Sequence, residues 1–386
     1  MANTGKILPF DFNLTARKLQ TTLPEILPEV QDACTRNYQF MALLESRGNM
    51  KFSCNGLGIN WKVKYRNHRV MGSNGENPRN YSQQNLYQTA RLDYRGYEVT
   101  DTISKKEVSQ NKGEAALINV FDGFEENLRT SIEQELGPQF YNDGYNATYP
   151  DYWHGLLSLY RQAGQTFYLN SNVMTARARN DADKVIVPAG SYGELDCTLG
   201  AYSGEQHDTS VIWPEGTADA HYDFWSPLML QWDKSGFSGT TDGEKLTHAM
   251  RFGITHAQRN SDKNGQMTNF WLDRTGYIAM KDYYGEKQTL EVTAGTELYQ
   301  LGFKNVMVFD GVEVSWEAAV PPGFGFGVNM QNMELRCLDD MLFSMDGPTY
   351  DMDVKLFKAA VETNSNIICR SPRNAVILAP GSAVAA

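Results

Sequence analysis

The sequence predicts a protein of the α+β class, in which helices and strands occupy separate stretches of the chain. From Gly113 to Leu136, apolar side chains recur at helical spacing, which indicates one long amphipathic helix. Residues 59–65 alternate between apolar and polar side chains, which is typical of a half-buried strand. Further along the chain, Asp310-Gly311 separates two apolar runs and predicts a β-hairpin.

The first part of the chain, residues 1–57, is expected to form an N-terminal arm with little core of its own. Prolines punctuate its beginning, and only the stretch from Leu27 to Ser46 has a helical pattern. Residues 58–110 are expected to form an extended hairpin. The alternating run that begins at Ile59 is followed by a second β-rich run that begins at Tyr87, and the two would pair as strands. An isolated hairpin is only marginally stable in water, so we expect this one to lie against another surface.

Residues 111–144 contain the long helix, which we call the spine helix. Asn111 and Glu114 form a capping pattern at its start, and Gly137-Pro138 predicts its end. At 1.5 Å per residue, a helix of this length extends for roughly 36 Å, well beyond the usual three or four turns. The alternative interpretation is an ordinary core helix.

Residues 145–335 are mixed, with weaker patterns. The sequence predicts a short helix from Trp153 to Gln162, helical stretches from Ser226 to Trp232 and from Lys245 to Gln258, and a clear helix over residues 269–288. The Asp-Gly hairpin falls in the last part of this segment, over residues 304–320. Residues 336–386 then read as strands, because residues 350–362 alternate as one long strand and two short strands flank the turn at residues 371–374.

Composition and charge exclude several classes of protein. The chain has 386 residues, of which 41% are hydrophobic and 21% charged, so it can bury a sizeable core in two or three units. No window approaches the ~18 apolar residues of a membrane span, and the N-terminus lacks a signal-peptide pattern, so we expect a soluble, intracellular protein without membrane partners. The net charge of −11 argues against a protein that grips nucleic acid. The five cysteines form no CxxC pair and predict neither a disulfide framework nor a zinc site.

Motifs that carry chemistry are missing. Residues 239–247, GTTDGEKLT, lack the Gly-Lys-Ser/Thr order of a phosphate loop, and Glu244 would repel phosphate. The GFGFG run at residues 323–327 lacks nucleotide-binding spacing and is expected to be a structural turn. No two of the six histidines have metal-ligand spacing on a predicted helix, and no G-x-S-x-G is present. We therefore expect neither an enzyme nor a cofactor or metal site.

The order of elements resembles that of the major capsid proteins of tailed bacteriophages, which have the Hong Kong 97 fold. The resemblance is carried by ELGPQFYNDG at residues 135–144, by the strand, turn and strand with the following Pro-Gly turn at residues 302–338, and by the closing strands at residues 354–379. These segments cover about a third of the chain, and the remainder resembles the family only in the order of its elements.

The resemblance implies an N-terminal arm at 1–57, an extended hairpin loop at 58–110, and a peripheral domain with the spine helix at 111–144 and long C-terminal strands at 336–386. Residues 145–335 would hold a mixed α/β axial domain, together with returning peripheral segments. In this family the axial domains meet around five-fold and six-fold axes, and the hairpin reaches over a neighbouring subunit. Some members carry a cleaved N-terminal region or a covalent cross-link, and we expect neither here.

The function implied is that of a structural subunit of an icosahedral virion capsid, which self-assembles into pentamers and hexamers around double-stranded DNA. Scaffolding, portal and decoration proteins are possible partners, no sequence-specific DNA binding is expected, and assembly would occur in the host cytoplasm. One alternative is an encapsulin-like shell of a protein nanocompartment. Another, from a different class, is a soluble hydrolase whose site the sequence does not reveal.

Charge changes sign between the hairpin and the spine helix. Residues 61–112 carry ten Lys or Arg against five Asp or Glu, a net charge of +5, whereas residues 113–143 carry seven acids against one Arg, a net charge of −6. An extended hairpin that points away from its own spine helix is free to meet the acidic spine helix of the next copy. The predicted contact residues between subunits are Lys62, Lys64, Arg66, Arg69, Arg79, Arg91 and Arg95 on the basic side and Glu125, Glu126 and Glu133 on the acidic side.

Overall fold

A computed structural model describes the larger part of the chain. Every structural statement below concerns these residues: 38–64, 87–106, 130–132, 134–146, 150–159, 185–186, 191–197, 225, 227–233, 237–258, 265–285 and 296–380.

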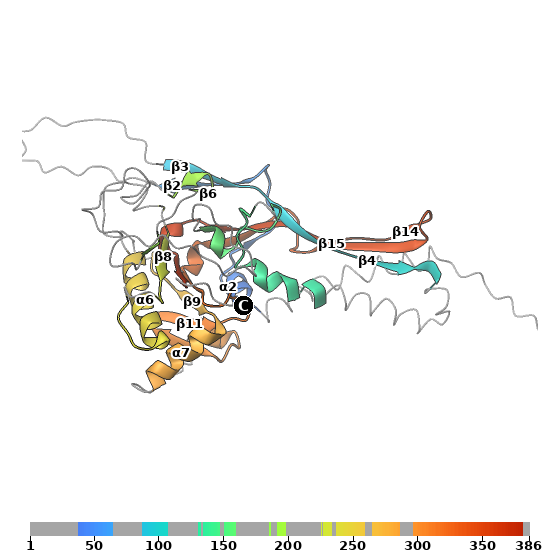
Figure 1. Ribbon diagram of the computed structural model, residues 1–386. Helices are drawn as coiled ribbons and strands as arrows, with labels where there is room; N and C mark the ends of the chain where they lie inside the picture. Colours follow the sequence, from blue (N-terminus) through green and yellow to red (C-terminus); the bar gives the residue numbers. More distant parts are fainter. Residues whose placement is uncertain are drawn as a thin grey trace, which may run out of the picture.

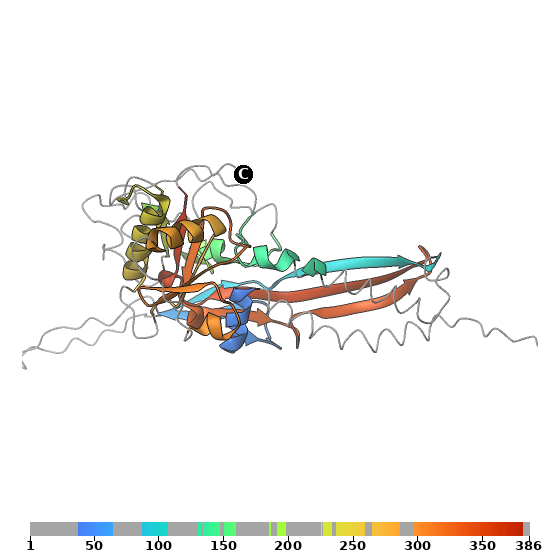
Figure 2. The ribbon, with the colours of Figure 1, turned by 90° about the horizontal axis from the view of Figure 1, so that it is seen from below.

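A five-stranded sheet forms the elongated part of the molecule. Its longest strand, β15, pairs along one edge with β4 and along the other with β14 and then β13, while β1 adds to β13 in parallel. Figures 1 and 2 show β4, β14 and β15 running out of the body side by side. We call these three strands the extension. The strands of this sheet are β1 (Met50–Lys51), β4 (Arg95–Ser104), β13 (Met333–Cys337), β14 (Ser344–Asp351) and β15 (Leu356–Cys369).

A seven-stranded sheet forms the body, in the order β10-β11-β9-β12-β16-β8-β5. Helices α6 and α7 pack on it through one cluster of buried apolar side chains (Figure 1). Its strands are β5 (Val185–Ile186), β8 (Leu228–Gln231), β9 (Asn269–Leu272), β10 (Val306–Phe309), β11 (Val312–Trp316), β12 (Gly325–Val328) and β16 (Val376–Ala379). The helices described in full are α2 (Gln39–Ser46), α6 (Asp242–Ala257), α7 (Arg274–Gly285) and α8 (Glu297–Gln300), with 3-10 turns at Leu156–Leu159, Met330–Asn332 and Pro372–Asn374.

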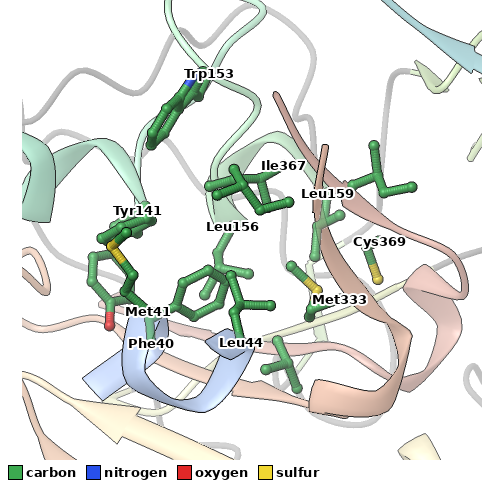
Figure 3. Packing of buried hydrophobic residues seen from close by; sticks show 14 of the residues in the cluster. Phe40, Met41, Leu44, Tyr141, Trp153, Leu156, Leu159, Met333, Ile367 and Cys369 are labelled. Atoms are coloured by element: carbon green, nitrogen blue, oxygen red, sulfur yellow. The ribbon is translucent and has the colours of Figure 1, made fainter. Parts of the chain in front are cut away.

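The two sheets are joined by a shared core around α2. Six of the eight residues of this helix are buried, and Figure 3 shows its apolar side chains facing Leu156, Met333 and Ile367. Phe40 contacts both Phe140 and Trp271, with ring centroids 5.1 and 5.5 Å apart. Because side chains from the two sheets enter this one cluster, α2 fixes the body to the root of the extension.

Two sequence signals fold as predicted. Helix α6 contains nearly all of the predicted stretch from Lys245 to Gln258 but begins three residues earlier, at Asp242. At this start the Thr241 hydroxyl accepts a hydrogen bond from the Glu244 backbone at 3.3 Å, and the Glu244 carboxylate accepts one from the Thr240 backbone at 3.0 Å. The predicted Asp-Gly hairpin is formed by β10 and β11, with Asp310 and Gly311 both at positive φ.

Two predicted helices are corrected by the structure. The stretch from Ser226 to Trp232 contains strand β8, which pairs in parallel with β16. The predicted helix at 269–288 is strand β9 followed by α7, and the boundary is Asp273, whose carboxylate accepts a hydrogen bond from the Gly276 backbone at 3.1 Å. Both β8 and β9 are buried along their whole length, and a buried apolar run carries no period that separates strand from helix.

The GFGFG run is also not a simple turn, because its last three residues belong to β12. A side chain at Gly327 would place its Cβ atom 2.5 Å from Cδ2 of Phe270 and 2.6 Å from Sδ of Met267. Glycine is therefore required by close packing inside the sheet.

The predicted strand at 350–362 is interrupted. Strand β14 ends at Asp351, the chain turns with Lys355 at φ +56°, and β15 begins at Leu356. At the C-terminus, the first of the two expected short strands is the end of β15, and β16 is the second.

Only the end of the predicted spine helix lies within the described residues. Residues 130–132 and 134–139 are helical, and Ile132 and Leu136 are buried as the apolar stripe requires. The helix continues through Gly137-Pro138, where the sequence predicted its end. A Cβ atom on Gly137 would overlap the ring of Tyr38, so this glycine permits close packing and does not end the helix.

Of the other predicted helices, α2 is the described part of the stretch from Leu27 to Ser46, and only a 3-10 turn at Leu156–Leu159 is described within Trp153–Gln162.

Candidate assembly surface

The predicted hairpin is formed by β2 (Ile59–Lys64) and β3 (Tyr87–Leu92), which pair antiparallel. Alternation along β2 gives the hairpin two unlike faces, as the sequence predicted. Trp61 and Val63 are buried on the inner face, whereas Lys62 and Lys64 are exposed on the outer one. The outer face of β3 adds Arg91.

An aromatic cluster holds the inner face of the hairpin to the body. The ring of Trp61 lies 6.2 Å from that of Tyr192 and 6.4 Å from that of Trp225, and Tyr192 stacks on Trp225 at 5.9 Å. Tyr192 comes from a short hairpin of β6 (Ser191–Tyr192) and β7 (Leu195–Asp196), whose turn residue Gly193 accepts a hydrogen bond from the Arg91 backbone at 3.0 Å. The inner face of the hairpin therefore packs against the rest of its own chain, and the basic outer face remains exposed.

The charges on the outer face differ in their partners. Among the described residues, neither Lys62 nor Lys64 forms an ion pair. Arg91 pairs with Asp93 at 3.3 Å, but both side chains are exposed, so the pair contributes little to stability. The hairpin thus presents two unpaired cations within the described chain. Arg66, Arg69 and Arg79, and the acidic residues Glu125, Glu126 and Glu133, lie outside the described residues, so no contact between the two sets is described.

Arg95 is held inside its own subunit. It begins β4, and its guanidinium donates to the backbone oxygens of Gly144 and Tyr152, the latter at 2.8 Å. Partial burial lowers the pKa of Arg95 from its usual value, although the group stays protonated at any physiological pH. Its contribution to contacts between subunits remains a prediction.

Arg95→Lys is expected to lower the free energy of unfolding by about 1–2 kcal/mol, because both hydrogen bonds come from Nη1 and the lysine side chain, which is one atom shorter, does not bring its Nζ to that position. Urea unfolding of the purified subunit measures this loss. Arg91→Lys is the matched control, since Arg91 is an exposed arginine on the neighbouring strand. Equal losses of unfolding free energy for the two substitutions would show that the two hydrogen bonds of Arg95 do not stabilise the folded state.

The extension has one apolar and one polar face. Val99 and Ile103 on β4 stand in register with Val361 and Phe357 on β15, on the face that meets the helix of residues 134–139. A cavity of about 190 Å³ between that helix and the sheet is lined by residues from both. The opposite face carries exposed polar residues, namely Glu98, Thr100 and Thr102 on β4 and Lys358 on β15.

At the tip of the extension, two apolar side chains are exposed. Met352 is 79% exposed and Val354 is 52% exposed, in the turn between β14 and β15. Sequence reasoning missed this tip because Met352 and Val354 alternate with acidic residues, as they would in a strand. The positive φ of Lys355 leaves no sequence mark, since lysine gives no hint of a turn.

A carboxyl group is buried where α2, β11 and the end of the described helix meet. The Tyr141 hydroxyl donates to Oε2 of Glu317 at 2.7 Å, and the Phe40 backbone also donates to this carboxyl group. Oε1 has no hydrogen-bond partner among the described residues. Burial raises the pKa of Glu317 to about 7, against the opposing effect of these two bonds. The nearby Gln39 amide accepts from Ser315 and Trp271, at 2.5 and 3.2 Å.

No group of three or more His, Cys, Asp or Glu residues is placed to hold a metal ion within the described ranges. No described helix has the length and apolar character needed to cross a membrane.

Comparison with known proteins gives structural matches alone. No protein-family model and no curated protein matches the chain. A chain of the Cyanophage A-1(L) capsid asymmetric unit is similar over 89% of this chain and 92% of its own length, with 12% identity and a TM-score of 0.56.

Looser likenesses are found to a chain in the capsid of Myoviridae Phage XM1 (10% identity, 88% and 92% covered, TM-score 0.46) and to one in the holo-SrpI encapsulin complex from Synechococcus elongatus PCC 7942 (9% identity, 88% of each covered, TM-score 0.45). The protein thus has a mixed α/β fold shared with a phage capsid chain, which confirms the resemblance seen in the sequence at the level of the fold.

Proposed function

We propose that the protein is a shell subunit of the capsid of a tailed bacteriophage, built on the Hong Kong 97 plan. The observation that carries this proposal is the likeness to the Cyanophage A-1(L) capsid chain, which spans nearly the whole of both chains. A match over 89% of this chain includes most of its sheets and helices and their order along the chain. It would not arise from one shared motif.

The proposed domains follow the sequence. An N-terminal arm occupies 1–57, the extended hairpin loop 58–110 and the spine helix 111–144, while the axial domain with returning peripheral segments covers 145–335 and peripheral strands occupy 336–386. On this assignment the seven-stranded sheet belongs largely to the axial domain and the extension to the peripheral domain. Strand β4 lies in the hairpin segment but pairs with β15, so it connects the hairpin loop to the peripheral domain.

Three features of the surface support a subunit whose exposed groups are covered by neighbouring copies in an assembly. The extension projects from the body, its tip exposes Met352 and Val354, and the hairpin exposes Lys62 and Lys64, which form no ion pair with any residue that the structure describes. Exposed apolar groups at the end of a projecting element are stabilised when a neighbour covers them. The net charge of −11 suits a wall that should not adsorb a packed DNA genome.

The proposed assembly consists of pentamers and hexamers in an icosahedral shell around double-stranded DNA. Scaffolding, portal and decoration proteins are its proposed partners, the virion is its location, and the host cytoplasm is where it assembles. Catalysis and membrane contact form no part of the proposal.

Electron microscopy of the purified protein, expressed alone and together with a candidate scaffolding protein, tests this function. Closed particles with five-fold and six-fold clusters are the expected result. A monodisperse monomer under all ionic conditions would contradict it and would favour a different class, such as the unrecognised hydrolase. The contents of natural particles decide between the two kinds of shell: nuclease-protected double-stranded DNA supports the capsid, whereas a packaged enzyme supports the encapsulin-like alternative.

Reversing charge on the hairpin is expected to impair assembly without unfolding the subunit. In the double variant Lys62→Glu with Lys64→Glu, both substitutions fall on the exposed face of β2, so circular dichroism and melting of the subunit should stay near normal. Each exposed ion pair contributes only about 0–1 kcal/mol, but every subunit repeats the contact. Light scattering should therefore show failed assembly, or assembly that depends strongly on salt.

The matched control is Lys62→Arg with Lys64→Arg, which keeps the charge and should assemble normally. Normal shells from the glutamate variant would contradict an electrostatic role for β2. The same reasoning applies to Arg66, Arg69 and Arg79, which belong to the predicted contact set.

A further inference from the structure

Two cysteines face each other at the root of the hairpin. Cys54 lies in the stretch between β1 and β2, and Cys337 is the last residue of β13. The backbone N–H of Cys54 donates to the carbonyl oxygen of Cys337 at 3.0 Å, and Ser53 donates to Asp339 in the same way, also at 3.0 Å. Two neighbouring backbone bonds thus hold the two residues opposite each other.

This backbone geometry suits a disulfide. Residues that share a backbone hydrogen bond between adjacent segments have Cα atoms about 5–6 Å apart, within the roughly 4.4–6.8 Å that a disulfide spans. Neither cysteine is in a disulfide, and the hydrogen bonds they would give up all involve sulfur and are weak. Cys337 Sγ donates to the Met341 oxygen at 3.2 Å and accepts from the Asp339 and Asn364 backbone, whereas Cys54 Sγ lies 3.5 and 3.9 Å from the Lys51 and Phe52 oxygens and also bonds Tyr94. Rotation of the two side chains would bring the sulfur atoms together.

Exposure sets the order of reaction. Cys54 is partly exposed, whereas Cys337 is buried beneath it. The other two described cysteines, Cys197 and Cys369, are both buried, so a soluble oxidant has no accessible first thiol in that part of the core. Among the four cysteines in the described residues, only the Cys54 and Cys337 pair combines a reachable thiol with a second thiol held next to it.

We propose that Cys54 and Cys337 form an intrachain disulfide when the protein meets an oxidising solution, which fixes the root of the β2–β3 hairpin to the five-stranded sheet. The oxidant is a low-molecular-weight disulfide such as glutathione disulfide. The Cys54 thiolate attacks one of its sulfur atoms and releases one glutathione thiolate. The Cys337 thiolate then attacks Cys54 Sγ and releases the second, so two cysteines are oxidised, one glutathione disulfide is reduced, and the two protons pass to the released thiolates.

The second step limits the rate. Burial raises the pKa of the Cys337 thiol to about 11, and the nearby Asp339 carboxylate and Cys54 act in the same direction. Tyr94 and Arg336 also lie beside the pair. Since only the thiolate reacts, ring closure is expected to be slow near neutral pH and to speed up about tenfold per pH unit over the range below that pKa. The reducing interior of a cell would leave both thiols free.

Oxidation of the purified full-length chain with glutathione disulfide tests the proposal. Remaining thiols are alkylated, and peptides are mapped by mass spectrometry with and without reductant. The expected product is a linked peptide pair containing Cys54 and Cys337, with the loss of two free thiols per chain. Its melting temperature should rise by several degrees and return on reduction, because the bond constrains the unfolded chain. Amide exchange in residues 49–58 should slow.

Two variants make the test specific. Cys54→Ser changes a partly exposed residue and should fold, keep Cys337 reduced and show no rise in melting temperature. Ser53→Cys combined with Cys54→Ser keeps the thiol count but moves the accessible thiol one position along the chain, opposite Asp339, where Cys337 is no longer its partner. A lasting glutathione adduct on Cys54, a link between two chains, or equal pairing in the shifted variant would each overturn the proposal. None of these outcomes depends on whether the protein forms shells.

Discussion

Leu44→Asp is expected to prevent folding of the subunit. Leu44 is fully buried in α2, within the cluster that joins the two sheets (Figure 3). The substitution removes about 1.5–3 kcal/mol of apolar burial and places an unpaired carboxylate where desolvation costs several kcal/mol more. These losses together approach the whole stability of a typical domain, about 5–15 kcal/mol. The variant should be insoluble or lack a cooperative melting transition in circular dichroism and calorimetry.

Leu44→Met is the control, because methionine has a similar volume and no charge and should cost less than about 1.5 kcal/mol. The comparison separates the effect of buried charge from the effect of altered packing. A soluble aspartate variant with an unchanged melting temperature would mean that α2 is not part of the shared core.

Glu317→Gln is expected to flatten the dependence of stability on pH between about 4.5 and 7. The folded state raises the pKa of Glu317 from 4.5 to about 7, so the folded protein holds this proton more tightly than the unfolded chain does. At pH values below 4.5 both states are protonated. As the pH rises towards 7, the unfolded chain releases the proton first, and the free energy of unfolding falls by about 3 kcal/mol before it levels off.

Glutamine keeps the shape of this side chain and removes its titration. Urea unfolding of wild type and variant at several pH values should give a difference that grows by up to about 3 kcal/mol in favour of the variant from pH 4.5 to 7.5. The comparison rests on this change with pH, because the new amide also adds a buried donor that costs about 1–3 kcal/mol at every pH. Glu98→Gln, on the exposed face of β4, should reproduce the wild-type profile. Parallel profiles for wild type and Glu317→Gln would show that this carboxyl group titrates normally.

Local sequence patterns correctly predicted those elements whose structure depends on interactions between residues close together in the sequence. The faces of β2 and the Asp310-Gly311 turn each depend on residues within a few positions of one another, and both fold as expected. Strands β8 and β9 were mistaken for helix because their apolar runs are buried on both faces, so that only their partners β16 and β12 decide their state.

The same distinction between local and distant interactions applies to the candidate assembly surface. The exposure of Lys62 and Lys64 follows from alternation along β2 and was predicted. The use of Arg95 inside the subunit was not predicted, because its acceptors are backbone oxygens 49 and 57 residues further along the chain. The exposed tip between β14 and β15 was not predicted, because a turn with lysine at the positive-φ position has no sequence signature.

The order in which the strands are made has a consequence for when the chain can fold. Strands β15 and β16 follow every other described strand in the sequence and are interior to the two large sheets: β15 lies between β4 and its partners β13 and β14, and β16 lies between β12 and β8. A chain still being synthesised therefore cannot close either sheet until residues 356–379 have left the ribosome. Native pairing across hundreds of residues is slow, so the two sheets close late in folding. In the proposed shell, a partly synthesised copy therefore lacks the finished sheets on which its contact surfaces depend.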